Sequence, residues 1–486
     1  MGLTRRDFFK RTGCALGATA LLAGIEQLSL IDALAQTPQA VTDYRALVCI
    51  FLSGGNDCNN TIVPYTDYNA TGGYNSVRSA SGLAIPQSSL LKISPPNTGG
   101  LEFGFHPNLS PEQASSSNPP GLLPIWQAGK LAILCNVGTL VQPLTRALYQ
   151  STPSARPYQL FSHSDQVTQQ QTSVSNTPGQ TGWGGRISDV LSNVNGAAPL
   201  PMIISTAGTA LFTTGQTTRS LSVAPAPTAL NQIFVLSMSG TSAEQTSRRA
   251  AFDQIRALDN NLSLVKATND TTAQALQTSA ALSQDQTLTT VFPATSLGNQ
   301  LKQIAKLIKA NLTQSSLNLK RQIFFCTLGG FDTHTNQTSA ALAGNQGNLF
   351  TQLSQAMNAF YNAMLELEQV SPGISSQVAT FTQSDFGRTF QPSGSGTATV
   401  GSDHGWGNHQ FIMGGAVLGG RFYGTYPTLA LGGPDDTDTR GRWIPTTSVD
   451  QYAATLARWY GVADVDVPTV FPFIGRFATS NLGFLG

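Results

Sequence analysis

Charged side chains are scarce in this 486-residue chain. Lys, Arg, Asp and Glu make up 11% of the residues, against about 25% in ordinary soluble domains. The formal net charge is only +1, so no basic field attracts a nucleic acid backbone. Uncharged Ser, Thr, Gln, Asn and Gly are abundant where charged residues would be usual. This composition suits a protein outside the cytoplasm. We therefore exclude nucleic acid from the expected partners.

Cysteine is also sparse. The chain has five cysteines and no Cys-x-x-Cys pair, which excludes a cysteine-based zinc or redox motif. Three of them lie inside apolar runs, where a buried thiol behaves as a small hydrophobic side chain. A disulfide is the alternative in an oxidising compartment, and the sequence leaves the pairing open among Cys49, Cys58, Cys135 and Cys326.

Membrane-length apolar runs are missing past the N-terminal segment, since none reaches the roughly 20 residues of a span. The N-terminus itself carries the twin-arginine pattern TRRDFFK at residues 4–10, then a weakly apolar stretch and a small-residue cleavage site at residues 33–35. A retained anchor is the alternative, but the stretch is short and interrupted by glycine. We expect residues 1–35 to be a removed signal peptide, with the twin-arginine translocase as a partner during export and a periplasmic or extracellular destination.

Short, continuous apolar runs bounded by turn residues organise the rest of the chain. Such runs are typical of strands buried on both faces, as in a parallel sheet. They cover residues 46–52, 131–137, 202–204, 323–328 and 378–382. Segments of helical character lie between them, at residues 242–266, 297–312, 349–370 and 449–460.

This alternation predicts an α/β layered fold with a central, mostly parallel sheet flanked by helices. Stretches rich in Gly, Ser, Pro and Asn favour long surface loops or small insertions over linkers between domains. These stretches are residues 69–120, 197–229 and 392–401. We expect one decorated domain over residues 36–486.

Histidine and aspartate gather where such a fold places its chemistry. Three of the five histidines fall in two Gly-flanked motifs, GGFDTH at residues 329–334 and DHGWGNH at residues 403–409. Asp57, Asp332 and Asp385 each follow a predicted strand, and ligands of open α/β sheets bind at the carboxyl ends of strands. The alternative is that each Asp merely caps the next helix.

Asp332 and His334 are two residues apart, so an extended chain points both to one side, where they can reach one ion. Carboxylate and imidazole suit Zn, Mn or Fe. For His404 and His409 the alternative is a hydrogen-bonded turn around Trp406.

Together with GGND at residues 54–57, SDFGRT at residues 384–389 and IPTTSVDQY at residues 444–452, these motifs resemble the bacterial family called domain of unknown function 1501. The resemblance covers nearly the whole mature chain. That family is similar to a distant branch of the alkaline phosphatase and sulfatase superfamily, whose members place two metal ions over a central sheet and transfer phosphoryl or sulfuryl groups.

The resemblance implies a ligand set and a nucleophile. By their order along the chain, the implied metal ligands are Asp57, Asp332, His334, Asp385, Asp403, His404 and His409. Ser162 takes the nucleophile's place, with Thr61 as its competitor. Arg388 or Arg186 is expected to hold a substrate oxygen.

His163 and His106 are expected to orient a ligand or to transfer a proton, with a purely structural hydrogen bond as the alternative. Two departures limit the match to the superfamily. Phe386 stands where the phosphatases have a histidine directly after the second aspartate, which leaves the second metal site open. The Cys/Ser-x-Pro-x-Arg sequence of sulfatases is missing, so we do not expect a conventional sulfatase.

The expected function is an exported metal-dependent hydrolase that acts on small or polymeric phosphate or sulfate esters. It would use one or two divalent ions, Zn first, with Mn or Fe as alternatives. The second hypothesis is a non-catalytic exported protein that keeps the fold and serves cell-surface polymer assembly or secretion, because a fold does not fix a function.

Overall fold

Among the residues that the structure describes, one mixed sheet carries the architecture, with nine strands in the order β13-β5-β12-β9-β1-β8-β6-β7 and β14 paired to β5. Strand β12 runs antiparallel to its neighbours β9 and β5, and the other pairings in this sheet are parallel. The strands are β1 (Arg45–Leu52), β5 (Leu131–Gly138), β6 (Ile203–Ser205), β7 (Leu221–Ser222), β8 (Arg321–Leu328), β9 (Val378–Ser384), β12 (Asn408–Met413), β13 (Phe422–Gly424) and β14 (Thr447–Ser448).

The computed structural model describes residues 43–111, 120–232, 242–284, 286–337, 344–394 and 399–486. Residues 44–486 form one compact unit. The predicted signal peptide at residues 1–35 lies outside the described residues. Among the helices that are described, none combines the length and the apolar character needed to cross a membrane.

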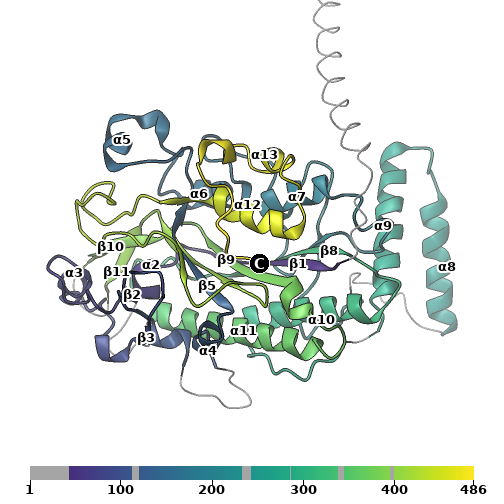
Figure 1. Cartoon of the computed structure of the whole chain (residues 1–486). Coiled ribbons are helices and arrows are strands. Elements are labelled where there is room, and N and C mark those ends of the chain that lie inside the picture. The colour runs from purple at the N-terminus through teal and green to yellow at the C-terminus, as the bar shows by residue number, and fades with distance from the viewer. Residues whose placement is uncertain (1–42, 112–119, 233–241, 285, 338–343, 395–398) are drawn as a thin grey trace, which may run out of the picture. The chain divides into compact units, whose positions relative to one another are not determined.

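Strand β1 shows why the sheet has two covered faces. Its side chains alternate: Val48 and Ile50 belong to one buried apolar cluster, and Leu47 and Cys49 to another. Helices α10 and α11 pack on the first face, and α7, α12 and α13 on the second (Figure 1). Both faces are buried, so the strand reads as a continuous apolar run.

The helices are α2 (Cys58–Thr61), α3 (Tyr74–Arg78), α4 (Leu123–Gln127), α5 (Arg146–Ser151), α6 (His163–Thr172), α7 (Trp183–Val190), α8 (Ala243–Ala257), α9 (Ser263–Ala281), α10 (Ser296–Thr313), α11 (Asn345–Leu367), α12 (Val449–Tyr460) and α13 (Val467–Val470). Helix α12 begins at a capping box in which Ser448 and Gln451 satisfy each other's backbone amides. Where one helix was expected over residues 242–266, the chain forms two, α8 and α9.

The expected α/β layered fold with a mostly parallel sheet is confirmed. The polar stretch at residues 69–120 is partly an insertion with its own structure, because β2 (Ile62–Pro64), β3 (Leu91–Ile93) and β4 (Phe103–Phe105) form a small antiparallel sheet. The hairpin of β10 (Arg388–Ser393) and β11 (Gly401–His404) lies past the end of β9. Cys49, Cys58, Cys135 and Cys326 are all buried free thiols.

Candidate metal centre

Three neighbouring parallel strands, β9, β1 and β8, end at the same edge of the sheet, and their loops build the site. The loops approach so closely that only glycine fits at one position. Gly54 has φ +115°, and a Cβ there would lie 2.3 Å from the backbone nitrogen of Asp332. The loop after β1 is thereby held against the loop that carries Asp332.

Four side chains converge at this edge: His163, Asp332, His334 and His404, named here the His–Asp cluster. His404 Nε2 lies 3.0 Å from His163 Nε2 and 2.9 Å from His334 Nε2. Asp332 Oδ1 lies 3.4 Å from His163 Nε2 and 3.1 Å from His334 Nε2. His163, Asp332 and His404 each offer one donor atom within 4.8 Å of the others, so they form a group that can hold a metal ion.

In each histidine ring of the cluster, the second nitrogen, Nδ1, points away from the cluster and contacts an oxygen atom. His163 Nδ1 contacts Asp385 Oδ2 at 2.7 Å, and His334 Nδ1 contacts Asp403 Oδ1 at 3.1 Å. His404 Nδ1 donates to the carbonyl oxygen of Phe161 at 2.7 Å. Carboxylates and carbonyls accept, so the Nδ1 protons are fixed outward. In the neutral rings, the Nε2 lone pairs then point into the cluster.

Nε2 atoms that lie 2.9–3.0 Å apart with their lone pairs directed at each other require a proton or a metal ion between them. Two ligands of one tetrahedral zinc ion lie about 3.3 Å apart, given bonds of about 2.0–2.1 Å. The contacts of Asp332 Oδ1 and the Nε2 atoms run from 2.9 to 3.7 Å. The donor set of imidazole and carboxylate therefore fits Zn, Mn or Fe.

The cluster opens to solvent. The side chain of Asp332 is 48% exposed and that of His334 is 44% exposed. A structural zinc site is closed by protein ligands, whereas a catalytic site keeps a position open. Solvent access of this kind is what a site with an open position would need.

Arg388 holds Asp332 in place. Its Nη1 donates to Asp332 Oδ1 at 2.9 Å and to Gly54 O at 3.2 Å, and its side chain is buried. Burial alone would raise the pKa of Asp332, but the Arg388 hydrogen bond and the nearby histidines outweigh it and hold that pKa below its usual value. The guanidinium expected to hold a substrate oxygen is thus engaged with Asp332.

The remaining histidine environments differ. The Asp385 hydrogen bond raises the pKa of His163, against the effect of burial. Burial lowers the pKa of His404, and the neighbouring rings lower it further. The backbone carbonyl that orients His404 belongs to Phe161, whose φ of 70° lies in the left-handed region. Strained backbone of this kind is concentrated at functional sites.

Asp403 occupies an outer position, between His334 and Arg440. Its Oδ2 accepts from Arg440, while Arg442 donates to the carbonyl oxygen of His404 at 3.0 Å. Asp385 is also an outer partner, because its Oδ1 accepts from Gly54 N at 3.1 Å. Both carboxylates had been expected as ligands, and the structure places each behind a histidine of the cluster.

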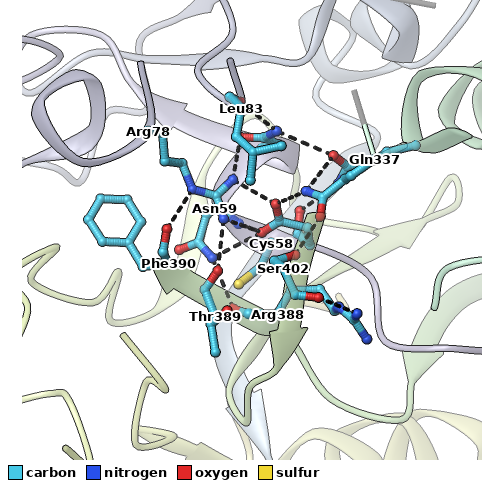
Figure 2. Close-up of polar contacts among 12 residues, drawn as sticks. Cys58, Asn59, Arg78, Leu83, Gln337, Arg388, Thr389, Phe390 and Ser402 are labelled. Atoms are coloured by element: carbon cyan, nitrogen blue, oxygen red, sulfur yellow. Dashed lines mark hydrogen bonds and ion pairs between the residues drawn. The ribbon is translucent and has the colours of Figure 1, made fainter. Parts of the chain in front are cut away.

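Asp57 is not brought to the cluster. It is fully buried and paired with Arg78, with 2.6 Å between Nη1 and Oδ2. It also caps α2 by accepting from Asn59 N at 3.0 Å, the capping role that was the alternative for it. Figure 2 shows Arg78, Asn59 and Gln337 converging on one point, and each of them bonds Asp57.

His409 and Thr61 are likewise buried elsewhere. His409 Nδ1 accepts from Asn136 N at 3.1 Å, and burial lowers its pKa to about 3. The hydroxyl of Thr61 donates to the carbonyl oxygen of Asp57 at 2.8 Å and accepts from Asn56.

Ser162 does stand beside the cluster. It is the N-cap of α6, directly before His163, and its hydroxyl donates to Asp165 Oδ2 at 2.6 Å. Arg186 instead binds backbone carbonyls, including that of Val470 at 2.8 Å.

His106 is buried with its Nδ1 accepting from Asn108 N. Two positions were placed imprecisely or not at all by the sequence. His163 was expected beside the site and lies within it, and its place among only five histidines was the available signal. Arg78 gave no signal, because an arginine at the end of a short helix is an ordinary surface residue by pattern.

The fold and the cluster define a layered α/β protein with a candidate metal centre at the carboxyl edge of its sheet. The chain belongs to the family described as Protein of unknown function (DUF1501), whose model matches residues 44–438. This finding confirms the resemblance inferred from the motifs. No curated protein matches the chain at a significant level.

The solved structures that overlap with the chain include the following two. One is the crystal structure of Ps i-CgsB in complex with k-i-k-neocarrahexaose, 9% identical, with a TM-score of 0.32, covering 90% of this chain and 77% of that one. The other is a mutant of the alkaline phosphatase PafA, 9% identical, with a TM-score of 0.23, covering 72% of this chain and 64% of that one. At scores this low, no residue role follows from either overlap.

Proposed function

We propose that this chain is an exported metal-dependent hydrolase of phosphate or sulfate esters, with the metal held by the His–Asp cluster. The observation that carries the proposal is the convergence of three Nε2 atoms around Asp332, each ring fixed from behind by an oxygen acceptor. Outer acceptors of this kind orient histidine ligands in metal sites. A cluster serving only packing would not direct its lone pairs at one another.

The ligands in this proposal are His163, Asp332, His334 and His404, with Zn as the first candidate. When bound, such an ion supplies Lewis acidity toward an ester oxygen and neutralises developing negative charge. The exposure of Asp332 and His334 leaves an open side for the ester.

Ser162 is the proposed nucleophile, because it adjoins His163 and is partly exposed. Asp165 accepts the hydroxyl hydrogen of Ser162 over 2.6 Å and would take that proton as the oxygen attacks the phosphorus or sulfur of the ester. The bond from that atom to the alcohol breaks, the alcohol leaves, and water then releases the group from Ser162. Thr61 is the weaker candidate, since its hydroxyl is buried and bonded to Asp57 O.

Arg388 and Asp385 act through the ligands in this scheme. Arg388 fixes Asp332, and Asp385 fixes His163. Their contribution is geometric, since a misplaced ligand loses reactivity steeply with distance.

Elemental mass spectrometry of the purified mature protein, beside the Asp332→Ala/His334→Ala double variant, tests the proposal. We expect stoichiometric Zn, Mn or Fe in the native protein and its loss in the double variant. A screen of phosphoesters and sulfoesters on the metal-loaded protein then identifies the substrate class.

A native protein that stays metal-free after reconstitution would contradict the metallohydrolase. The non-catalytic exported protein would then be the better account. Stoichiometric metal without turnover of any ester would retain the centre but contradict the hydrolase.

A further inference from the structure

The buried carboxylate at the end of β1, Asp57, has all of its acceptor capacity used by protein donors. Its Oδ1 accepts from Asn59 N and Asn59 Nδ2, both at 3.0 Å, and from Arg78 Nη2 at 3.2 Å. Its Oδ2 accepts from Arg78 Nη1 at 2.6 Å and Gln337 Nε2 at 2.5 Å. A carboxylate has about four lone-pair sites, and five donors fill them.

Arg78 is satisfied to the same degree. Besides Asp57, its N–H groups donate to Asn60 Oδ1 at 2.6 Å, to Thr389 O at 2.9 Å and to Phe390 O at 3.0 Å. A guanidinium has five N–H donors, and these contacts use all five. The side chains of Arg78 and Asp57 are both 0% exposed, so the carboxylate is neutralised without a metal ion.

From this pair the bonding continues to the loops that carry the cluster. Gln337 Oε1 accepts hydrogen bonds from Ser402 Oγ at 2.5 Å and from Thr333 Oγ1 at 3.2 Å. Thr333 lies between two cluster residues, and Ser402 is two residues before a third. Figure 2 shows Gln337 and Ser402 on one side of this network and Arg78 on the other.

We infer that Arg78 stands where a second metal ion would be bound at Asp57, so that the chain holds one ion, and that Asp57, Arg78 and Gln337 position its ligands. These three residues are named the Asp57 hub. The inference rests on the proposed metal centre and replaces the expectation of one or two ions with one. The members of the hub are positioning residues, because they act through Thr333 and Ser402 on the ligand loops.

Calorimetric titration of the metal-free mature protein with Zn²⁺ tests the inference. We expect one equivalent for the native protein and loss of binding in Asp332→Ala. Arg78→Lys keeps the positive charge but loses the two-pronged guanidinium contact with Asp57. Gln337→Met keeps the length of the side chain but loses its hydrogen bonds. Both are expected to retain one equivalent with a Kd raised about 10-fold or more, the range seen when partners behind metal ligands are lost.

Leu301→Ala is the matched control, because it removes a fully buried side chain from α10 and lowers stability without touching the hub. Its Kd should equal that of the native protein at a comparable loss of thermal stability. If Arg78→Lys does not fold, Gln337→Met alone decides, since it leaves the ion pair intact.

The outcomes separate the two proposals. Two equivalents that fall to one in Asp57→Asn would overturn the inference and leave the metal centre standing. An unchanged Kd in the folded hub variants would also overturn it. No Zn²⁺ binding by the native protein would overturn the metal centre, and this inference with it.

Discussion

His163 and Asp385 meet over 2.7 Å between Nδ1 and Oδ2, and this contact directs the Nε2 of the ring at His404. The other oxygen of Asp385 accepts from Gly54 N at 3.1 Å. One carboxylate therefore joins the loop after β9, the loop after β1 and the first residue of α6. Its role in the proposed centre is to aim a ligand.

Substitutions of Asp385 should weaken metal binding without abolishing it. Asp385→Asn retains a neutral acceptor for His163, so we expect a Kd for Zn²⁺ about 10-fold higher, and about 100-fold higher for Asp385→Ala. Competition with a chromogenic chelator measures this. Asp189→Asn is the control, because Asp189 accepts from the loop amides of residues 216–218. Equal Kd values for all four proteins would remove Asp385 from the site.

The nucleophile is tested by separating chemistry from metal content. On an ester found by the screen, Ser162→Ala should lower kcat by about 10³-fold or more, as loss of a nucleophile does, with the metal retained. Thr61→Val removes the competing hydroxyl at nearly constant shape and should leave kcat within a few-fold of the native value. Burst kinetics with a chromogenic leaving group supply the check. Wild-type turnover in Ser162→Ala would contradict the assignment.

The strands of the central sheet were predictable because burial on both faces leaves a local trace. Residues 46–52 and 323–328 are continuous apolar runs, and they became β1 and β8. The break between α8 and α9 was not visible, since Leu258 and Leu262 continue the apolar pattern through the turn. Strand β12 is polar at its start and also escaped the pattern.

Less of the site was predictable, because the role of each residue depends on contacts between segments that are far apart in the sequence. Asp332, His334 and His404 stood out by composition, and the structure brings them together. Asp57 carried the same signal of an aspartate after a strand, yet its cation comes from Arg78, in an insertion whose docking no spacing reveals. Proximity to a strand end thus located the edge of the sheet but not the role of each carboxylate.

Gly54 should not tolerate a side chain, because both its backbone conformation and its surroundings oppose one. Gly54→Ala introduces a side chain at φ +115° and a Cβ 2.3 Å from Asp332 N, so we expect a loss of more than about 1–2 kcal/mol in stability and weaker metal binding. Gly329→Ala is the control, since a Cβ there meets nothing within 4 Å. Urea unfolding and Zn²⁺ titration of both variants measure the difference. An undisturbed Gly54→Ala would show that the two loops can separate.

Two buried histidines make the fold acid-sensitive. Burial lowers the pKa of His106 and of His409 to about 3, while an unfolded histidine titrates near 6.5. The unfolded state binds more protons in between, so their stabilisation is complete above about pH 6.5 and is lost as the pH falls toward 3. His106→Asn keeps an acceptor for Asn108 N and removes one titrating ring. Urea unfolding between pH 7 and 4 should show a shallower loss for this variant, and an unchanged slope would contradict the account.

Asp450 changes stability with pH in the opposite direction to the two buried histidines. Its replacement by asparagine should make the protein more stable at high pH. Its side chain is fully buried, with Oδ2 bonded to Ser448 Oγ at 2.9 Å. Burial raises its pKa to about 6, against hydrogen bonds from Ser448, from Ser173 and from the backbone amides of Asp450 and Phe473. The folded state therefore binds the proton more tightly, and this contribution to stability, full below about pH 4, is lost as the pH rises through 6.

Asp450→Asn removes the cost of a buried charge and keeps an acceptor for Ser448. At pH 8 we expect a gain of about 1–3 kcal/mol, given about 1.4 kcal/mol per unit of pKa shift, and little or no gain at pH 4.5, where the native carboxyl is mostly protonated. Comparing the two proteins at each pH cancels the titration of the buried histidines. Asp464→Asn alters a side chain that is 84% exposed and should show no such pH-dependent difference. A variant less stable than the native protein at pH 8 would mean that the ionised carboxylate is held by partners stronger than Ser448.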